Sequence, residues 1–470
     1  MNSNYILISI ILLIFSLIEE IKGSVILGNI QKLNRNVDLT GRYMESQINL
    51  TFENNNNQAI YTFYYAVPNY YNQTLVNILF QSPGNDFEIE GELVTDPVFT
   101  TSQHHTLYQY QLPNKLLPGD SVTIYLREIF MNRFDPLPKN IDMQAIQKLV
   151  YTDNKYFYTP YTVQSQKTTF ISGKIISNTE DSKTVVRKNQ VKYGVYENIQ
   201  PYQEGEIKIH FENNTPLAFF KNVTKDIEVS HWGNIAISSY FQLENAGAGL
   251  KGEFDRTNRN FMNIAQSALK GLHAELPYHA WGVSYFDEIG NISTSNAWRN
   301  RQDKVVHLDI KHRFPIFGGW KSNFNLEYNL NTSRYIYDLD DNQYMLKQLF
   351  SQPFLDLVAE NYQLKVLLPQ GAYDIDVTLP FKVDNQEQIK SYKYLDTEGR
   401  PTLVFSKQMV TGFHNQYFYV TYRLDQFEMY KKPFLIFSFF FSFFMIAILL
   451  NRMDSTNQVI NTEKIDKKDK

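Results

Sequence analysis

The sequence predicts a mainly β protein: two β-sandwich-like domains followed by a single C-terminal transmembrane helix. Short segments that alternate apolar and polar residues, or are rich in β-branched and aromatic residues, recur along the chain, and turn sequences with Pro or Gly separate them. Tyr and Phe are abundant, with 32 and 34 copies, and aromatic side chains favour strands. An uninterrupted apolar run near the C-terminus predicts the helix. The clearest strand segments are 48–52, 60–64, 122–126, 207–211, 375–379 and 417–422.

The N-terminal element is an apolar block at residues 5–18, which has the length of the h-region of a signal peptide. No Lys or Arg precedes the block, so its only positive charge is the α-amino group. We predict a signal peptide over residues 1–23, with cleavage near Gly23. An N-terminal membrane anchor is the alternative, and it is disfavoured because the block is short for a bilayer span.

The C-terminal apolar run, FLIFSFFFSFFMIAILL at 434–450, contains no charge. At about 1.5 Å per residue it spans roughly 26 Å, close to the core of a thin bilayer at about 27 Å. We predict a transmembrane helix over 433–450, with Pro433 in the first turn, where a missing N–H costs little. Lys431, Lys432 and Arg452 flank the span and can reach the interfaces. A buried core helix is disfavoured because Phe occurs all around this helix.

A signal peptide followed by one helix would place residues 24–430 in the lumen and the tail, 451–470, in the cytosol. Basic residues are more frequent in the tail than just before the helix, in agreement with the positive-inside rule. Lys467 and Lys468 stand fourth and third from the C-terminus, which resembles the dilysine retrieval signal of type I membrane proteins of the endoplasmic reticulum. A solvated basic tail is the alternative.

The lumenal part, about 410 residues, is too large for one hydrophobic core and predicts two domains, at 24–224 and 225–430. Residues 37–54 and 227–245 share a pattern of strand, turn and second strand ending in Glu-Asn, which suggests that the two domains are related. Helices are predicted at 142–148 and 261–272, with a weaker candidate at 342–349.

Composition excludes several classes of function. A net charge of −4 argues against a nucleic-acid partner. The absence of cysteine excludes disulfides, cysteine-ligated zinc and cysteine nucleophiles. Six N-x-S/T sequons all lie in the predicted lumenal part, and Asn291, in a polar turn, is the best candidate for N-glycosylation. The sequon residues are Asn49, Asn72, Asn213, Asn222, Asn291 and Asn331.

One motif suggests a nucleotide site. Gly247, Gly249 and Gly252 spell G-x-G-x-x-G after a predicted strand. A phosphate cradle also needs a helix that begins at the third Gly, or a following Lys-Ser/Thr. Residues 253–260 have no apolar helical face, and Gly252 is not followed by Lys-Ser/Thr. We therefore predict a loop between strands.

The titratable residues form no recognisable catalytic motif. His273 to His279 is not H-E-x-x-H, and Pro277 would break the helix that this motif needs. His307 and Asp309 share one face of a predicted strand, but two such groups alone do not make a metal site. The acids near 338–341 lack the Gly and the closing Glu of an EF-hand loop. We predict no catalytic, cofactor-binding or metal-binding residues; the other residues considered were His104, His105, Asp287, Glu288, Asp338, Asp340 and Asp341.

Several longer motifs, in chain order, resemble the ribophorin I family. They are residues 155–161 (KYFYTPY), 210–216 (HFENNTP), 229–236 (VSHWGNIA), 287–295 (DEIGNISTS), 313–321 (RFPIFGGWK) and 394–401 (YLDTEGRP). The family resemblance implies subunit 1 of the oligosaccharyltransferase complex, which transfers a preassembled glycan from dolichyl diphosphate to Asn of N-x-S/T. It also implies that the active site and its metal ion belong to another subunit.

The expected partners are therefore other oligosaccharyltransferase subunits, including the catalytic one, nascent polypeptides and membrane lipid. No cofactor is expected. The expected location is the endoplasmic reticulum membrane, as a single-pass type I protein. The alternative is a lumenal glycan- or cargo-binding protein such as a lectin-like chaperone or receptor. A membrane-tethered hydrolase is disfavoured by the motif search. We interpret Trp320 as a core residue rather than a contact residue.

Overall fold

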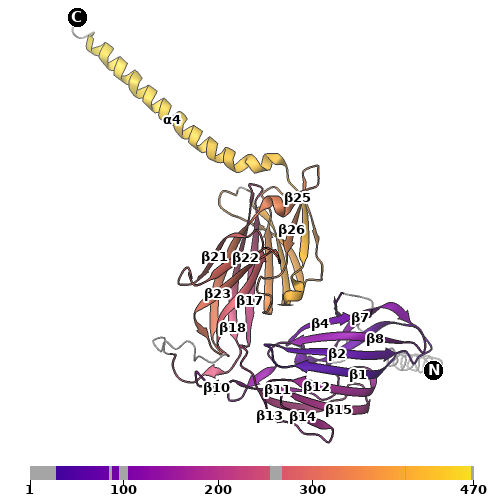
Figure 1. Ribbon diagram of the computed structural model, residues 1–470. Coiled ribbons are helices and arrows are strands. Elements are labelled where there is room, and N and C mark those ends of the chain that lie inside the picture. Colours follow the sequence, from indigo (N-terminus) through magenta and orange to yellow (C-terminus); the bar gives the residue numbers. More distant parts are fainter. Residues whose placement is uncertain (1–27, 84–86, 95–103, 255–266, 397, 467–470) are drawn as a thin grey trace, which may run out of the picture.

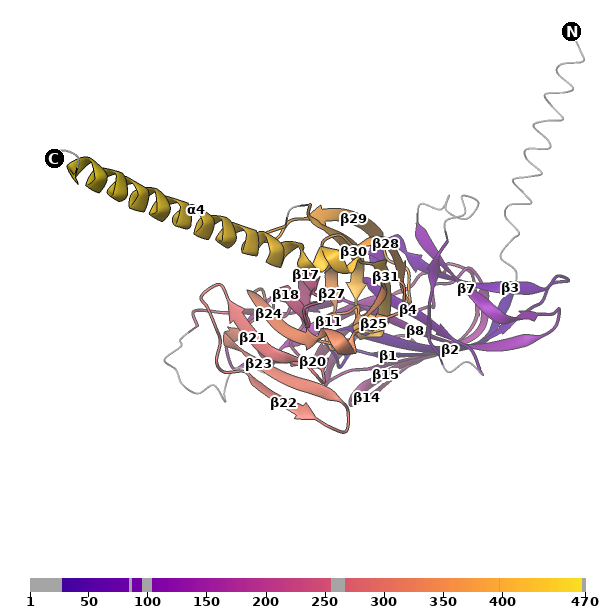
Figure 2. The same ribbon diagram turned by 90° about the horizontal axis from the view of Figure 1, so that it is seen from above.

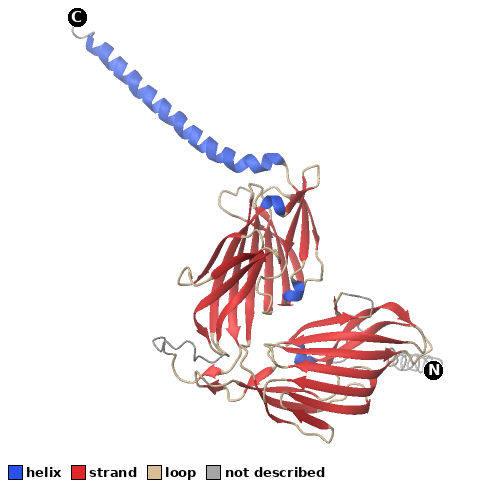
Figure 3. Cartoon of the chain, viewed as in Figure 1, coloured by secondary structure: helices blue, strands red, loops and turns tan. Residues whose placement is uncertain are grey.

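The computed structural model describes residues 28–466 except 84–86, 95–103, 255–266 and 397. The predicted signal peptide and the tail lysines Lys467 and Lys468 lie outside the described residues. Strands dominate the described chain (Figure 3), as the sequence predicts. They form two groups of sheets, which we call the N-half (β1–β16) and the C-half (β17–β31).

The N-half contains one large sheet and two smaller ones, and a single hydrophobic cluster joins all three. The large sheet has the order β14(Thr184–Arg187)-β15(Gln190–Ile199)-β12(Thr162–Ile171)-β1(Asn29–Asp38)-β2(Met44–Glu53)-β8(Ser121–Phe130)-β4(Leu75–Gln81)-β5(Ile89–Glu90). The smaller sheets are β3(Ile60–Pro68)-β7(His105–Leu116)-β6(Glu92–Leu93) and β13(Ile175–Asn178)-β16(Glu206–Glu212)-β11(Lys148–Asn154)-β9(Phe134–Pro136). The short helix α2(Asn69–Asn72) follows β3.

The C-half has the same composition of sheets around its own hydrophobic cluster. Its large sheet has the order β21(Trp281–Asp287)-β24(Lys321–Asn331)-β18(Asn234–Asn245)-β17(Ala218–Val229)-β27(Ala359–Leu367)-β30(Arg400–Val410)-β29(Asn385–Ser391). The smaller sheets are β20(Leu269–Pro277)-β23(Val305–Ile316)-β22(Asn296–Asn300) and β25(Ile336–Asp338)-β26(Gln343–Leu349)-β31(Tyr417–Arg423)-β28(Tyr373–Thr378). The 3-10 turns η2(Thr332–Arg334) and η3(Gly412–His414) complete it.

Apart from the short edge strand β5, which has no counterpart, these sheets repeat the same topology in both halves. The order β14-β15-β12-β1-β2-β8-β4 corresponds to β29-β30-β27-β17-β18-β24-β21, and both smaller sheets correspond in the same way. In each large sheet the first strand is antiparallel to the second and parallel to a strand from late in the half. The pattern shared by 37–54 and 227–245 is therefore the opening hairpin of each half. Buried and half-buried residues alternate along the whole of β18, as expected for a strand with one face on the core.

Two predicted helices are wrong, and a third lies largely outside the described residues. Residues 142–147 form a turn and irregular backbone, and the buried Gln147 at the end of this segment bonds to both halves of the molecule instead of continuing a helix. Residues 343–349 are β26, because pairing with β31 and burial of alternate side chains override local helix propensity. Of 261–272, residues 261–266 are not described and 269–272 belong to β20.

The C-terminal helix α4 runs over Gln426–Asp466, so it begins seven residues before the predicted Pro433 and continues beyond residue 450. Its segment Phe427–Met453 is long and apolar enough to cross a membrane, and none of it is buried in the protein. Pro433 lies inside the helix rather than in its first turn, and Figure 1 shows a bend near the start of α4, as expected for an internal Pro. Figures 1 and 2 both show α4 leaving the C-half on the side away from the N-half.

Candidate functional site

The base of α4 is the first candidate site, and we call it the helix base. Here the start of α4 meets the end of β17, the start of β30 and the loop before β28, around a cavity of about 120 Å³. Two of the motifs that carry the family resemblance, 229–236 and 394–401, come together at this point. The lining residues used below are Glu228, His231, Trp232, Arg400, Lys431 and Lys432.

A chain of ion pairs ties α4 to the C-half. Arg400 Nη1 lies 2.5 Å from Glu228 Oε1, and Arg400 Nε lies 3.2 Å from Asp396 Oδ2. Lys432 Nζ reaches the other oxygen of Asp396 at 2.5 Å, and Lys431 Nζ pairs with Glu398 at 3.2 Å. One carboxylate thus links a sheet residue to a residue of the helix, which fixes the direction in which α4 leaves.

The Asp396 carboxylate has no exposed area, although both of its cationic partners are partly exposed. Burial alone would raise the pKa of Asp396, but the hydrogen bonds from Lys432 and the Lys393 backbone and the charge of Arg400 outweigh it, so the pKa is lowered. The group is therefore ionised at neutral pH. A buried carboxylate with two cations is costly to leave unpaired, so Asp396 is the residue on which the helix base depends most.

Aromatic residues border the same place. His231 Nε2 lies 2.7 Å from the Tyr422 hydroxyl, and burial lowers the pKa of His231, which favours the neutral imidazole. The neighbouring Trp232 is 66% exposed and packs edge-on against Tyr430 of α4, with the two ring centroids 6.0 Å apart. Trp and Tyr beside the end of an apolar span are typical of the interface between membrane and water.

A glycine completes the helix base. Gly371 has a φ of +82°, and a Cβ there would come within 2.7 Å of the Glu428 side chain in the first turn of α4. Only Gly combines this backbone conformation with such a close approach. The turn sequence Leu-Pro-Gln-Gly at 368–371 is therefore shaped to receive the helix.

The G-x-G-x-x-G segment is a contact between the two halves. Gly249 pairs with Asn140 through the short strands β19(Gly249–Leu250) and β10(Asn140–Ile141), and a Cβ on Gly247 would lie 2.5 Å from Gln147 Oε1. The described residues that follow Gly252, up to 254, are not helical. These glycines let one backbone approach another, and the geometry gives no phosphate cradle.

Other contacts join the halves. The Tyr43 hydroxyl accepts a hydrogen bond from Val358 N at 2.9 Å and donates to Ala218 O at 3.1 Å. A small apolar cluster of Val76, Met131, Phe219 and Val358 lies beside it. Asn77 Nδ2 donates to Thr411 Oγ1 at 3.1 Å. Glu90 of the N-half lies 3.7 Å from both Lys407 Nζ and His414 Nε2 of the C-half.

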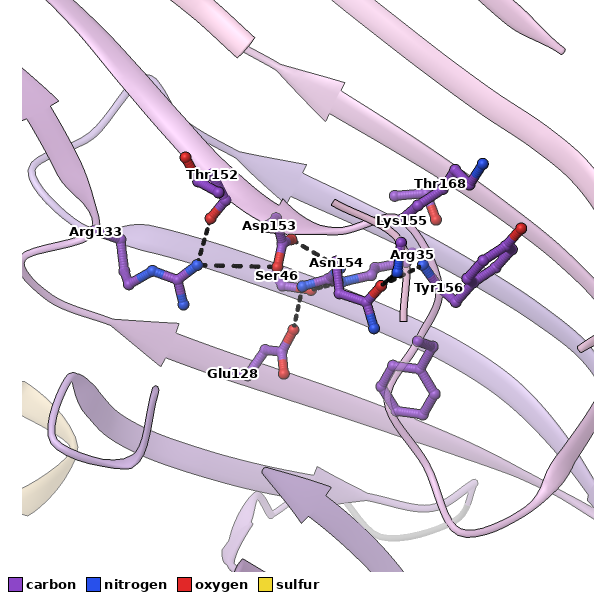
Figure 4. A network of polar contacts seen from close by, with 12 residues as sticks. Arg35, Ser46, Glu128, Arg133, Thr152, Asp153, Asn154, Lys155, Tyr156 and Thr168 are labelled. Carbon is purple, nitrogen blue, oxygen red and sulfur yellow. Dashed lines mark hydrogen bonds and ion pairs between the residues drawn. The ribbon is translucent and has the colours of Figure 1, made fainter. Parts of the chain in front are cut away.

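The N-half also contains a buried charge network (Figure 4). Arg35 pairs with Glu128 at 3.0 Å and Asp153 at 2.9 Å, and Arg133 lies 4.0 Å from Asp153. Tyr65 donates a hydrogen bond to Glu128. The cavity beside these groups is about 30 Å³, far smaller than ligand pockets of about 300–1,000 Å³. The charges balance and a substrate does not fit, so the network is structural.

The strand-face pair His307 and Asp309 has a third member that the sequence does not reveal. His273 Nδ1 lies 2.7 Å from Asp309 Oδ1, and its Nε2 lies 3.1 Å from His307 Nδ1. These residues are neighbours because β20 and β23 pair, with His273 opposite Asp309. Recognising the cluster from sequence would have required the register of that pair.

The other residues singled out in the sequence have local partners. His105 stacks on Tyr202 at 4.5 Å. Asp287 accepts two hydrogen bonds from Arg313, which lower its pKa. Asp338 caps a turn by accepting from Asp340 N. Trp320 is half-buried and packs on Phe317 at 5.2 Å, beside Phe254.

Five of the six sequon residues are exposed, and one is not. Asn213 is 6% exposed, and its amide donates to Leu39 O at 3.0 Å and Gly41 O at 3.1 Å. A glycan on that nitrogen would break both bonds, so Asn213 fits modification less well than the others. The exposed residues are Asn49, Asn72, Asn222, Asn291 and Asn331. Which of them carry glycan stays a prediction, as does the expectation of no catalytic or cofactor residue.

Comparison with known proteins gives one family. A family model described as Ribophorin I matches residues 29–451. The Caenorhabditis elegans protein named dolichyl-diphosphooligosaccharide–protein glycosyltransferase subunit 1 is 38% identical over 356 residues, covering 74% of this chain and 60% of that protein. Subunit 1A from Arabidopsis thaliana is 31% identical over 434 residues, covering 90% of this chain and 70% of that protein. The chain therefore spans 60% of the length of the nematode relative.

Among solved structures, leukotriene A4 hydrolase from Saccharomyces cerevisiae overlaps 44% of this chain and 29% of its own, at 11% identity and a TM-score of 0.25. A two-domain M1 zinc metallopeptidase overlaps 43% of this chain and 48% of its own, at 11% identity and a TM-score of 0.22. TM-scores this low support no argument about fold or function.

Proposed function

The chain belongs to the ribophorin I family, and from this we propose that it is a non-catalytic subunit of the oligosaccharyltransferase complex. In this role it supports the transfer of a preassembled glycan from dolichyl diphosphate to Asn of N-x-S/T in nascent proteins. The observation that carries the proposal is the family match over 29–451, which covers both halves and reaches into α4. Relatives from an animal and a plant are named as subunit 1 of that glycosyltransferase.

The mechanism that we propose is scaffolding. α4 sits in the membrane beside other subunits, and the helix base holds the C-half at a fixed angle to it. The contacts at Tyr43, Gln147 and Glu90 then position the N-half relative to the C-half. A stack of two β-units fixed to one helix can hold nascent polypeptide near an active site on another subunit. The partners proposed are the other subunits, including the catalytic one, nascent chains and lipid.

The location and orientation are part of the same proposal: the endoplasmic reticulum membrane, single-pass type I, with both halves in the lumen. We also propose that the halves are two domains. The hydrophobic clusters divide between Leu217 and Ala218, seven residues before the boundary at 224 that the sequence suggests. Five exposed sequon residues in the halves are compatible with a lumenal location.

The test is depletion of the chain combined with measurement of glycan occupancy on a reporter glycoprotein and copurification with the catalytic subunit. We expect hypoglycosylation and copurification. Normal occupancy together with no copurification would overturn the assignment and favour the alternative, a lectin-like chaperone or cargo receptor in the same membrane.

A sharper version uses the helix base. Asp396→Asn removes the charge that joins Arg400 to Lys432, and we expect less catalytic subunit to copurify. Glu387→Gln is the matched control, because Glu387 is an exposed carboxylate of the same half that accepts a local hydrogen bond from Asn385. Equal loss from both variants would contradict a specific role of the helix base.

A further inference from the structure

The outer face of the three-stranded sheet β20-β23-β22 carries a cluster of metal-ligating groups. His273, Glu275 and His307 each offer one ligand atom, and these atoms lie within 4.8 Å of one another. All three belong to the face that points away from the C-half core, because they alternate with buried residues on their strands. The cluster lies outside every contact used in the proposed function.

The geometry of the two histidines suits a shared ion. His273 Nε2 and His307 Nδ1 are 3.1 Å apart, and the two rings lie nearly parallel, with an interplanar angle of 30°. In a tetrahedral zinc site with Zn–N bonds of about 2.0–2.1 Å, two nitrogens are about 3.3–3.4 Å apart. A shift of a few tenths of an ångström would therefore bring both nitrogens into the first coordination sphere. Glu275 is exposed, so a change of rotamer can bring its carboxylate in.

The Asp309 carboxylate, which is not one of the three ligands, orients the His273 ring. Asp309 Oδ1 lies 2.7 Å from His273 Nδ1, and an N–H that donates there leaves Nε2 with its lone pair facing His307. Metal-ligating histidines almost always donate their other ring N–H to a carboxylate, a backbone carbonyl or a water. Asp309 is thus a positioning residue, and the four groups have the roles that a metal site requires.

The N-half supplies an independent comparison. By strand register, its counterparts of His273, Glu275 and His307 are Tyr64, Ala66 and Leu107. Those residues belong to an apolar cluster that Tyr158 and Tyr202 cover. In the C-half the same face of the corresponding sheet is polar and is not covered by apolar side chains. The three ligand residues therefore stand where the N-half has a packed apolar cluster.

We propose that His273, His307 and Glu275 bind a divalent transition-metal ion of the Zn²⁺ class. Two imidazoles and one carboxylate are ligands that suit Zn²⁺, and the Irving–Williams order places Cu²⁺ above it in affinity. The ion ties β20 to β23 and leaves a fourth position open to water or to a donor from a partner. In a chain without cysteine, it is a cross-link that needs no disulfide.

The test is titration of the full chain, purified in detergent without a polyhistidine tag and stripped of metal, with ZnCl₂ by calorimetry. We expect one ion per chain at this site, lost in both His273→Gln and His307→Gln. Asp309→Asn should weaken binding by about 10–100-fold and not abolish it. His279→Gln is the matched control, since His279 is close in sequence but outside the cluster. Unchanged stoichiometry and affinity in both His273→Gln and His307→Gln would overturn the site.

A built-in reporter separates this site from others on the chain. Trp298 stacks on His307 at 5.4 Å, so Cu²⁺ bound there should quench its emission. We expect the quenching to disappear in Trp298→Phe, while calorimetric Zn²⁺ binding remains. Quenching of equal size in Trp298→Phe would place the ion elsewhere and contradict the proposal. Thermal melting of each metal-free variant identifies any variant that fails to fold, and Glu275→Gln then replaces it.

Discussion

The N-half and the C-half place a buried basic side chain at the same point of the same strand but surround it with different partners. Both opening strands carry a register shift, after Ile30 in β1 and after Phe220 in β17. Counting from that shift, Arg35 corresponds to Lys225. Arg35 is held by two carboxylates, whereas Lys225 donates to the carbonyls of Leu349 and Ser351 at 2.7 and 2.9 Å.

The partner strands explain the difference. Glu128 of β8 stands opposite Ser46, and the corresponding position of β24 is Tyr328, opposite Ile237. Among the described residues, no carboxylate lies within ion-pair distance of Lys225. The two halves therefore share the geometry of the repeat, but the electrostatics at this point depend on which side chain β8 or β24 contributes. Topology can repeat where the chemistry of the core does not.

The largest expected effect is on the N-half. Arg35→Met leaves Glu128 and Asp153 buried with fewer partners, and such a loss costs about 3–5 kcal/mol. All four Trp residues lie in the C-half, so Trp emission follows the C-half alone while far-UV circular dichroism follows both halves. We expect the urea midpoint by circular dichroism to fall and the Trp midpoint to move much less. Arg187→Met, at an exposed position of β14, should change neither by more than about 0.5 kcal/mol.

The second effect is a dependence of stability on pH that we expect from Lys225. Burial lowers the pKa of Lys225 from 10.5 to about 7, so between these values the unfolded chain binds the proton that the folded chain has released. The free energy of unfolding of the C-half should therefore rise with pH from about 7 to 10.5. Below pH 7, Lys225 should contribute no change with pH. The upper bound is about 5 kcal/mol; relaxation around the amine reduces it, and we expect about half.

Lys225→Met tests this directly, because Met cannot titrate. The variant should lose the slope of Trp-detected stability against pH, and below pH 7 it should be at least as stable as the native chain, since the cost of burying an ammonium is gone. Lys270→Met, at an exposed position of β20, should keep the slope. A slope that survives in Lys225→Met would mean that another group titrates.

A third experiment asks whether the repeat extends to its polar residues. Asn54 follows the last residue of β2, and Asn245 is the last residue of β18. Each amide donates to two backbone carbonyls, and its Oδ1 accepts the N–H two residues later. Each Asn→Ala change leaves buried carbonyls unsatisfied and should cost about 2 kcal/mol. We expect equal losses, one seen only by circular dichroism and the other by Trp emission as well. Unequal losses of stability in the two variants would show that Asn54 and Asn245 do not have equivalent roles.

The sequence predicts the strands, the C-terminal helix and the first hairpin of the repeat, because each leaves a local pattern of alternation or an apolar run. It does not predict the rest of the repeat, since register is conserved between the halves while residue identity is not, as at Glu128 and Tyr328. Arg35 and Lys225 stand in segments, NRNVD and TKDIE, that resemble exposed strand edges. Burial comes from sheets that the local sequence does not reveal.

The candidate sites also depend on contacts between distant segments, which the local sequence does not reveal. The helix base joins segments from 228 to 432, and the histidine cluster joins residues 34 positions apart. Family motifs pointed to two of the segments at the helix base, but their proximity depends on the order β17-β27-β30 in the large sheet. The early start of α4 has the same origin: the predicted helix begins at Pro433, and the local sequence does not reveal that Lys431 and Lys432 pair with Glu398 and Asp396 of the C-half.

The smallest expected effect concerns the link between the halves. Burial raises the pKa of Tyr43 to about 12, so its hydroxyl stays protonated and can both donate to Ala218 O and accept from Val358 N. Tyr43→Phe removes both bonds and should cost about 1 kcal/mol. Because the bonds join the halves rather than support either core, we expect the circular dichroism and Trp midpoints to separate from each other. Tyr61→Phe, at a position 61% exposed, should leave both midpoints in place, and a Tyr43→Phe chain whose midpoints stay together would show that the apolar cluster around Phe219 couples the halves without the hydroxyl.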